Sequence, residues 1–223
     1  MKKVLLSLFM LFASLPILAQ DATVIGDLYN TTNDTEVTVE GTVTTPVGAL
    51  GSGNFYIQDE TGGIAVYISG DTMPELMVGS ITQVKGILTI ANNGEYSITV
   101  ADAADVTPMD GENAELVPAS ILTDDAPRHL AELVRAEGII IGTTWYWGDD
   151  YLIMTSNEDP SNGNLIIYLP GSLATDFGTS EPINGETVCI TGIVKTFNLA
   201  GDYYFYGVIP RSGDDLMMGA CEA

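Results

Sequence analysis

The side chains best suited to hold a ligand are aromatic, and the densest group is Trp145, Tyr146 and Trp147. On an extended segment, residues two apart share one side, so Trp145 and Trp147 would present two indole rings to the same space. Adjacent rings of this kind can stack on sugar rings or on nucleic-acid bases. We therefore predict all three as ligand-binding residues. The alternative is that the tryptophans cover a seam between domains.

A second aromatic cluster runs from Tyr203 to Tyr206. On a strand, Tyr204 and Tyr206 face one way and the other two residues face the opposite way. One pair has to pack inside the protein, so only one pair is free to bind. We predict Tyr204 and Tyr206 as ligand-binding residues; the alternative for the whole cluster is core packing with ordinary surface exposure.

The sequence offers little for catalysis or metal binding. His129 is the only histidine, and there is no His/Cys cluster, no Gly-x-Ser-x-Gly elbow and no phosphate-cradling glycine loop. Residues 157–164 alternate oxygen ligands like the start of a calcium loop, but the glycine comes one residue late and the bidentate Glu is missing. A hairpin with an Asn162-Gly163 turn explains that segment better. We expect no catalytic residue, no metal site and no cofactor.

The elements that would position these side chains occur twice. VEGTV at 39–43 returns as AEGII at 136–140, and IAVYISG at 64–70 returns as LIIYLPG at 165–171. A repeat of about 100 residues is too long for a solenoid unit and matches a duplicated small domain.

Each copy contains five short segments with the period-two alternation of half-buried strands. In the first copy they are 37–43, 54–58, 64–68, 81–90 and 95–100; in the second they are 133–142, 151–155, 164–169, 186–196 and 202–209. Five antiparallel strands with a connection after the third is the order of an OB-fold barrel. We predict an all-β protein made of two tandem five-stranded OB-fold (Greek-key) barrels. Trp145 and Trp147 then fall in a loop that this fold commonly uses for ligands.

Residues 1–19 have the layout of a cleaved secretory signal peptide: Lys2 and Lys3, an apolar run, then Ala19. The run is short for a membrane span, and no later stretch is long enough for one. The expected organisation is 1–19 signal peptide, 20–108 first barrel, 109–132 linker with a short helix, and 133–223 second barrel. The protein would be secreted or periplasmic, with a retained N-terminal anchor as the alternative.

Two cysteines are present, Cys189 and Cys221. If Val188 and Ile190 face the core, Cys189 faces outward, where a C-terminal tail carrying Cys221 could reach it. Export would make pairing chemically possible. We predict a Cys189–Cys221 disulfide, with two free thiols as the alternative.

Carboxylates dominate the charge: 30 acidic residues face 7 basic ones, for a formal net charge of −23. Beyond the signal peptide the cations are Lys85, Arg128, Arg135, Lys195 and Arg211. Such a surface repels polyanions, and nucleic-acid affinity rests mainly on cations that neutralise phosphates. We therefore do not expect duplex nucleic acid as a partner, and we expect a monomer.

The stretch NFYIQDETGGIAVY at 54–67, with Glu40-Gly41 before it and Val84-Lys85-Gly86 after it, resembles the exported bacterial OB-fold domains found beside secreted nuclease and lamin-tail domains. The end of the apolar run, Leu18-Ala19-Gln20, is similar to those of Bacteroidetes members. The resemblance covers 35–108 strongly and 133–216 moderately. It implies a binding role, often for nucleic acid, without catalysis.

Taken together, these features predict an exported, non-catalytic tandem OB-fold binding module. Its expected ligand is an oligosaccharide or a protein segment, held by the rings of the second barrel. One alternative is a structural or accessory protein of the cell envelope with no small ligand. The second alternative, implied by the resemblance, is binding of single-stranded nucleic acid.

Overall fold

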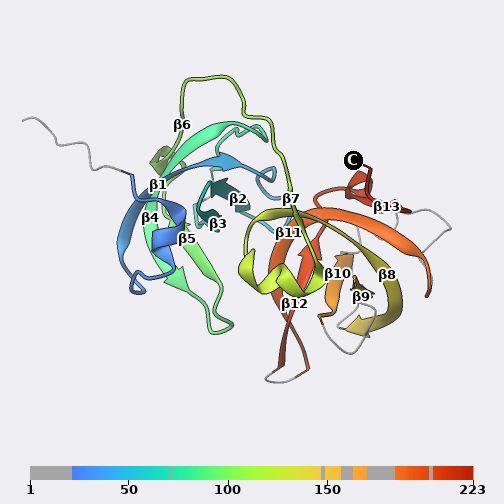
Figure 1. Cartoon of the computed structure of the whole chain (residues 1–223). Coiled ribbons are helices and arrows are strands. Elements are labelled where there is room, and N and C mark those ends of the chain that lie inside the picture. The colour runs from blue at the N-terminus through green and yellow to red at the C-terminus, as the bar shows by residue number, and fades with distance from the viewer. Residues whose placement is uncertain are drawn as a thin grey trace, which may run out of the picture.

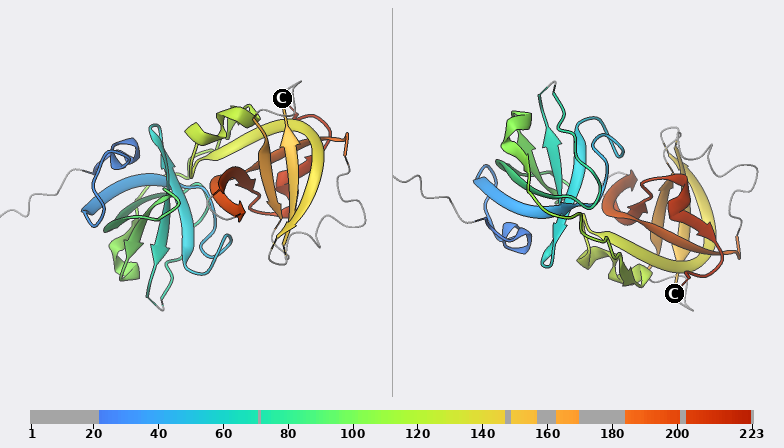
Figure 2. Two further views of the ribbon diagram at one scale, coloured as in Figure 1. Left: turned by 90° about the horizontal axis from the view of Figure 1, so that it is seen from below. Right: turned by 90° about the horizontal axis from the view of Figure 1, so that it is seen from above.

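The computed structural model describes residues 22–70, 72–146, 149–156, 163–169, 184–200 and 203–222. The side chains of 144–146, 149–150, 198–200 and 203 are not described. The predicted signal peptide, 1–19, lies outside these residues. Strands dominate the described part and form two sheets, which lie side by side in the molecule (Figures 1 and 2).

The first sheet closes into a five-stranded barrel. Its strands are β1 (Glu36–Val43), β2 (Asn54–Asp59), β3 (Gly62–Ile68), β4 (Ile81–Ile90) and β5 (Tyr96–Val100). They follow the order β1-β2-β3-β5-β4, and β1 pairs with β4 to close the ring. All these pairings are antiparallel except β3 with β5. A short strand, β6 (Val106–Pro108), follows 3-10 helix η1 (Ala103–Asp105) and extends the sheet beside β4.

The second sheet repeats this topology. Its strands are β8 (Leu133–Tyr146), β9 (Asp149–Thr155), β10 (Leu165–Leu169), β11 (Thr187–Ala200) and β12 (Tyr203–Ile209). Pairing of β8 with β11 closes the ring, and β10 runs parallel to β12. Two short strands extend it: β7 (Ala119–Ile121), and β13 (Leu216–Met218), which follows 3-10 helix η3 (Gly213–Asp215). The predicted fold class, two closed five-stranded barrels in tandem, is confirmed.

Each barrel has a core of its own, built by the inward-facing residues of its strands. Val39, Leu88 and Ile98 are fully buried in the first core, and Ile140 and Val194 are fully buried in the second. The repeated glycines of β4 and β11 allow close strand contact. A Cβ on Gly86 would lie 2.6 Å from the Thr99 carbonyl oxygen, and one on Gly192 would lie 2.2 Å from that of Ile209.

A short helical segment leads into each barrel and covers its core. Helix α1 (Ile25–Leu28) buries Ile25 and Leu28 completely in the first barrel. The counterpart in the second is the 3-10 helix η2 (Thr123–Arg128), which buries Ala126. The segment between the barrels contains this 3-10 helix, which ends before His129. No helix among the described residues is long and apolar enough to cross a bilayer.

The two barrels pack directly on each other through a small apolar seam. Tyr56 of the first barrel and Leu133 and Ile193 of the second are buried together there. Hydrogen bonds flank the seam: the Leu133 amide donates to Gln58 Oε1 at 3.0 Å, and Arg211 Nη1 donates to the Thr44 carbonyl at 3.2 Å. The seam therefore fixes one outer face of the first barrel against the second.

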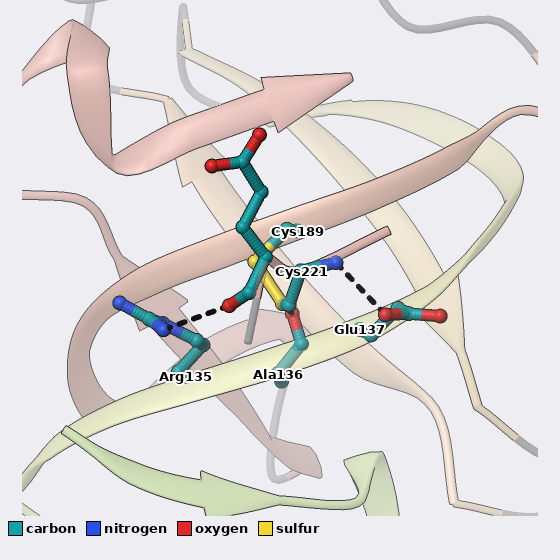
Figure 3. Close-up of a disulfide and its surroundings, with 6 residues drawn as sticks. Arg135, Ala136, Glu137, Cys189 and Cys221 are labelled. Carbon is teal, nitrogen blue, oxygen red and sulfur yellow. Dashed lines mark hydrogen bonds between the residues drawn. A yellow bond between two sulfur atoms is a disulfide. The ribbon is translucent and has the colours of Figure 1, made fainter. Parts of the chain in front are cut away.

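A disulfide joins Cys189 of β11 to Cys221 near the C-terminus, with the two Cα atoms 5.0 Å apart (Figure 3). Val188 and Ile190 lie in the second core, so Cys189 points to the other side of β11, as strand alternation requires. Its side chain is nevertheless fully buried. The C-terminal tail covers it, anchored by the Cys221 amide, which donates to Glu137 Oε2 at 2.8 Å.

Candidate functional site

A cavity of about 330 Å³ lies where the outer face of the first barrel meets the second barrel. Strands β2, β3, β4 and β5 of the first barrel supply most of its lining. Tyr29, Ala91 and Glu95 add to it from other segments of the first barrel. The second barrel and the segment that leads into it supply Leu130, Ala131, Val194 and Lys195. The cavity is therefore a composite site that belongs to both copies of the repeat.

Strand alternation decides which side chains of the first barrel reach this cavity. The residues of β2, β3 and β5 that face the core are Phe55, Ile57, Ile64, Val66, Ile68, Ile98 and Val100. The residues between them must face outward. These are the cavity-lining side chains Asn54, Tyr56, Ala65, Tyr67, Ser97 and Thr99. Strand register sets Tyr67 beside Asn54 on one side and Thr99 on the other.

Two tyrosines that contact each other form a fixed wall of the cavity. The rings of Tyr29 and Tyr96 have centroids 4.9 Å apart and a tilted arrangement. The Tyr29 hydroxyl donates to the Gly63 carbonyl at 2.5 Å and lies 3.3 Å from the Leu130 carbonyl. Burial, with a smaller contribution from Glu132, raises the pKa of Tyr29 to about 12. Tyr29 is therefore neutral at physiological pH, and its ring forms part of the cavity wall.

The charged groups of the cavity are Lys195 and Glu95. Lys195 Nζ lies 4.0 Å from Glu95 Oε2, and Tyr56 is the second group that interacts with the Lys195 ammonium. Burial alone would lower the pKa of Lys195, but its interactions with Tyr56 and Glu95 outweigh this and raise it. Lys195 is therefore a permanent cation. The other Glu95 oxygen accepts a hydrogen bond from the Thr196 amide at 2.9 Å.

The seam closes one flank of the cavity. Tyr56 is only 2% exposed, and the backbone of Ala131 lies against Gly63 so closely that a Cβ there would be 2.2 Å from the Ala131 carbonyl oxygen. On the other flank Tyr67 is 43% exposed. A ligand would therefore enter past the Tyr67 ring, with the seam behind it.

The outer face of the second barrel carries rings that pack on one another. Tyr151 and Tyr168 stack with centroids 5.0 Å apart, and Phe197 lies across both at 6.1 and 5.5 Å. The Phe197 ring also covers Gly207, where a Cβ would approach it to 2.7 Å. Sequence reasoning missed these three residues, although the repeat aligns Tyr168 with Tyr67.

The structure describes the side chains of only two of the predicted ligand-binding residues, Tyr204 and Tyr206. The backbones of Trp145 and Tyr146 belong to β8, but their side chains lie outside the description, and Trp147 lies outside the described residues altogether. Tyr206 packs against the second core, whereas Tyr204 is 44% exposed. Alternation puts Tyr204 and Tyr206 on one side of β12, but only Tyr206 reaches the interior.

Sequence reasoning also missed the tyrosines of the cavity: Tyr29, Tyr56, Tyr67 and Tyr96. Tyr56 and Tyr67 lie within the stretch at 54–67, so alternation could have placed both on the outer face. Within the described ranges, no group of three or more His, Cys, Asp or Glu side chains is placed to hold a metal ion. Residues 157–162, most of the segment compared with a calcium loop, lie outside those ranges.

Comparison with known proteins gives the class of fold first. Residues 37–106 match the family model described as "OB-fold nucleic acid binding domain". This match covers the strands of the first barrel, including the cavity-lining part of β2, β3 and β5. The chain matches no curated protein.

Solved structures are similar to this chain at low identity. The fission yeast Pot1 structure with ssDNA is 11% identical, with a TM-score of 0.41, over 89% of this chain and 87% of that one. A murine DNA binding protein bound with ds DNA is 11% identical, with a TM-score of 0.40, over 83% and 99%. A replication protein A heterotrimer bound to ssDNA is 16% identical, with a TM-score of 0.32, over 85% and 49%.

The exclusion of duplex nucleic acid, drawn above from net charge, is corrected: residues 37–106 match a family model whose description, nucleic acid binding, makes no distinction between single strands and duplexes. Two of the similar solved structures contain double-stranded DNA, the murine protein above and the Ifi202 HINa domain with 20bp dsDNA. The physical reason is that net charge sums over a whole chain, whereas phosphate contacts depend on where individual cations lie. The acidic composition therefore does not remove duplexes from the possible partners.

Proposed function

We propose that this chain is a non-catalytic tandem OB-fold module that binds single-stranded nucleic acid. The observation that carries the proposal is the match of residues 37–106 to a nucleic-acid-binding OB-fold family, because the same residues supply the tyrosine-lined outer face. The comparisons give no support to the oligosaccharide or protein ligand expected from the sequence. The second alternative, binding of single-stranded nucleic acid, fits the comparisons better.

Binding would rely on ring faces more than on charge. Stacking of a base on an aromatic side chain contributes about 1–3 kcal/mol, and the exposed Tyr67 ring is placed to do this. Each cation among the described residues already has a partner: Lys85 with Glu36, Arg128 with Asp125, Arg135 with the Glu222 carbonyl, Lys195 with Glu95, and Arg211 with Asp215. Phosphate neutralisation therefore adds little.

A titration by fluorescence anisotropy tests this proposal. A labelled single-stranded oligonucleotide, such as a thymidine 12-mer, is titrated with protein at several salt concentrations. We expect binding whose logarithmic salt slope is about −0.7 to −1.4, as one or two phosphate contacts would give. Tyr67→Ala should weaken binding roughly tenfold, the loss of one stacked base. Absence of binding even at low salt would refute the proposal.

We also propose that the chain is exported, with residues 1–19 removed, and that it belongs with the exported OB-fold domains it resembles. The support is the charged, then apolar, then small-residue layout at 1–19. Expression in a Gram-negative host followed by N-terminal sequencing tests this, with Gln20 expected as the first residue. A mature protein that still begins at Met1 in the cytoplasm would contradict it.

A further inference from the structure

We propose that the cavity between the barrels is a site for one unpaired base, whose polar edge is held by Lys195 and Glu95. This inference rests on the proposed function and narrows it to one place in the molecule and one unit of the ligand. Three observations lead to it: the size of the cavity, the polar pair inside it, and the neutral rings around it.

The size of the cavity favours a single ring system. Its volume of about 330 Å³ lies at the lower end of the range for small-molecule sites. The seam residues Tyr56, Leu133 and Ile193 close it on one flank. A strand cannot run across the sheet at that flank, so a base has to enter from the side of Tyr67.

The polar pair offers one donor next to one acceptor. Lys195 has three N–H donors, and its contacts with Tyr56 and Glu95 leave at least one available. Glu95 Oε1 is occupied by the Thr196 amide, which leaves Oε2 as the acceptor, 4.0 Å from Lys195 Nζ. Every nucleobase carries a donor beside an acceptor on its pairing edge, and proteins read unpaired bases on that edge.

The surroundings suit a flat, neutral group better than a phosphate. Tyr67 and Tyr96 supply ring faces, and Leu130, Ala131 and the backbone of Val194, whose side chain lies in the second core, complete the lining on the side of the second barrel. The one cation is balanced by Glu95, so the site has no net positive charge for a phosphate. The base would therefore enter while the sugar–phosphate chain stays outside.

Both barrels are needed for this site, since Glu95 belongs to the first and Lys195 to the second. This distinguishes it from a site confined to the face of one OB-fold. It also provides a matched pair of variants. Lys195→Met removes the cation inside the cavity, and Lys85→Met makes the same charge change at an exposed position of β4, paired only with Glu36.

The experiment measures binding of the labelled thymidine 12-mer to the full chain and the two variants, with thymidine nucleoside as competitor. A backbone amide NMR spectrum with the nucleoside alone reports on the Thr196 amide, which donates to Glu95. We expect Lys195→Met to weaken oligonucleotide binding at least tenfold more than Lys85→Met. We also expect millimolar nucleoside to compete and to shift the Thr196 resonance.

Each outcome decides between the inference and the function on which it rests. If the oligonucleotide binds but both variants lose affinity equally and the nucleoside neither competes nor shifts Thr196, this inference is wrong and the proposed function stands. If the nucleoside binds at Thr196 but the oligonucleotide does not bind, the cavity takes free nucleosides and the proposed function is wrong. If neither binds, both are wrong. Thermal unfolding of the variants confirms that each is folded.

Discussion

The two barrels share one strand order but fill the same outer face in different ways. In the first barrel Asn54, Ala65 and Ser97 line a cavity. By strand register their counterparts in the second are Tyr151, Ile166 and Gly207, and there the rings of Tyr151, Tyr168 and Phe197 pack on one another. The inward residues are apolar in both barrels, whereas the outward residues differ. One barrel carries a cluster of packed rings and the other carries a cavity.

The disulfide is the largest difference in covalent structure between the barrels, because only the second carries one. Breaking it in the double variant Cys189→Ser/Cys221→Ser should lower the free energy of unfolding by about 3.7 kcal/mol, as expected for a loop of 32 residues. Urea unfolding followed by far-ultraviolet circular dichroism measures this. An unchanged transition would show that the tail adds no stability to the second barrel.

The contact of Gly63 with Ala131 should be the most sensitive point of the seam. Gly63→Ala would set a Cβ 2.2 Å from the Ala131 carbonyl oxygen, so the backbone has to shift. Overpacking of this kind costs about 1–3 kcal/mol, and it should also weaken nucleic-acid binding by opening the cavity. Urea unfolding and the anisotropy titration measure the two effects. Gly111→Ala, with no atom within 4 Å of the new Cβ, is the neutral control.

Removing the Phe197 ring would make the second barrel resemble the first. Phe197→Ala uncovers Gly207 and leaves Tyr151 and Tyr168 without their edge contact. Phe197 is half-buried, so we expect a loss of about 2 kcal/mol, below the usual range for a core Phe→Ala change. Oligonucleotide affinity should not change, because the ring lies outside the cavity. A tenfold change in affinity would place the second face in the binding surface.

The smallest expected effect concerns Tyr29: above pH 10 the stability of the native protein should fall more steeply with pH than that of the Tyr29→Phe variant. Burial raises the pKa of Tyr29 to about 12 from its ordinary value of 10.0, so between these values the folded state holds a proton that the unfolded chain releases. Stability from this group is complete below pH 10 and falls as pH rises toward 12. Tyr29→Phe should flatten that fall. Thermal unfolding from pH 8 to 11.5 checks it, and identical slopes would contradict the assignment.

The sequence was sufficient to predict the fold because the repeat and the period-two alternation are local patterns. Val37, Val39 and Val43 on one strand and their counterparts in the second copy are enough to mark inward faces. The cavity was not predictable in this way. It requires Leu133, Ile193 and Lys195 to dock against Tyr56, and nothing in a sequence pattern sets the relative placement of two domains. The prediction for Trp145 and Trp147 stays open, because their side chains lie outside the described residues.

The halves of this protein are joined by more than the connection from 109 to 118, whose Leu116 packs against the seam. Arg211 reaches back to the Thr44 carbonyl, Asn93 donates to the Thr196 hydroxyl, and Gln58 accepts the Leu133 amide. After a protease cuts the exposed connection, we expect the two fragments to stay associated and to elute together in size-exclusion chromatography. Conversely, a barrel produced on its own would lack the seam contacts and part of the cavity lining.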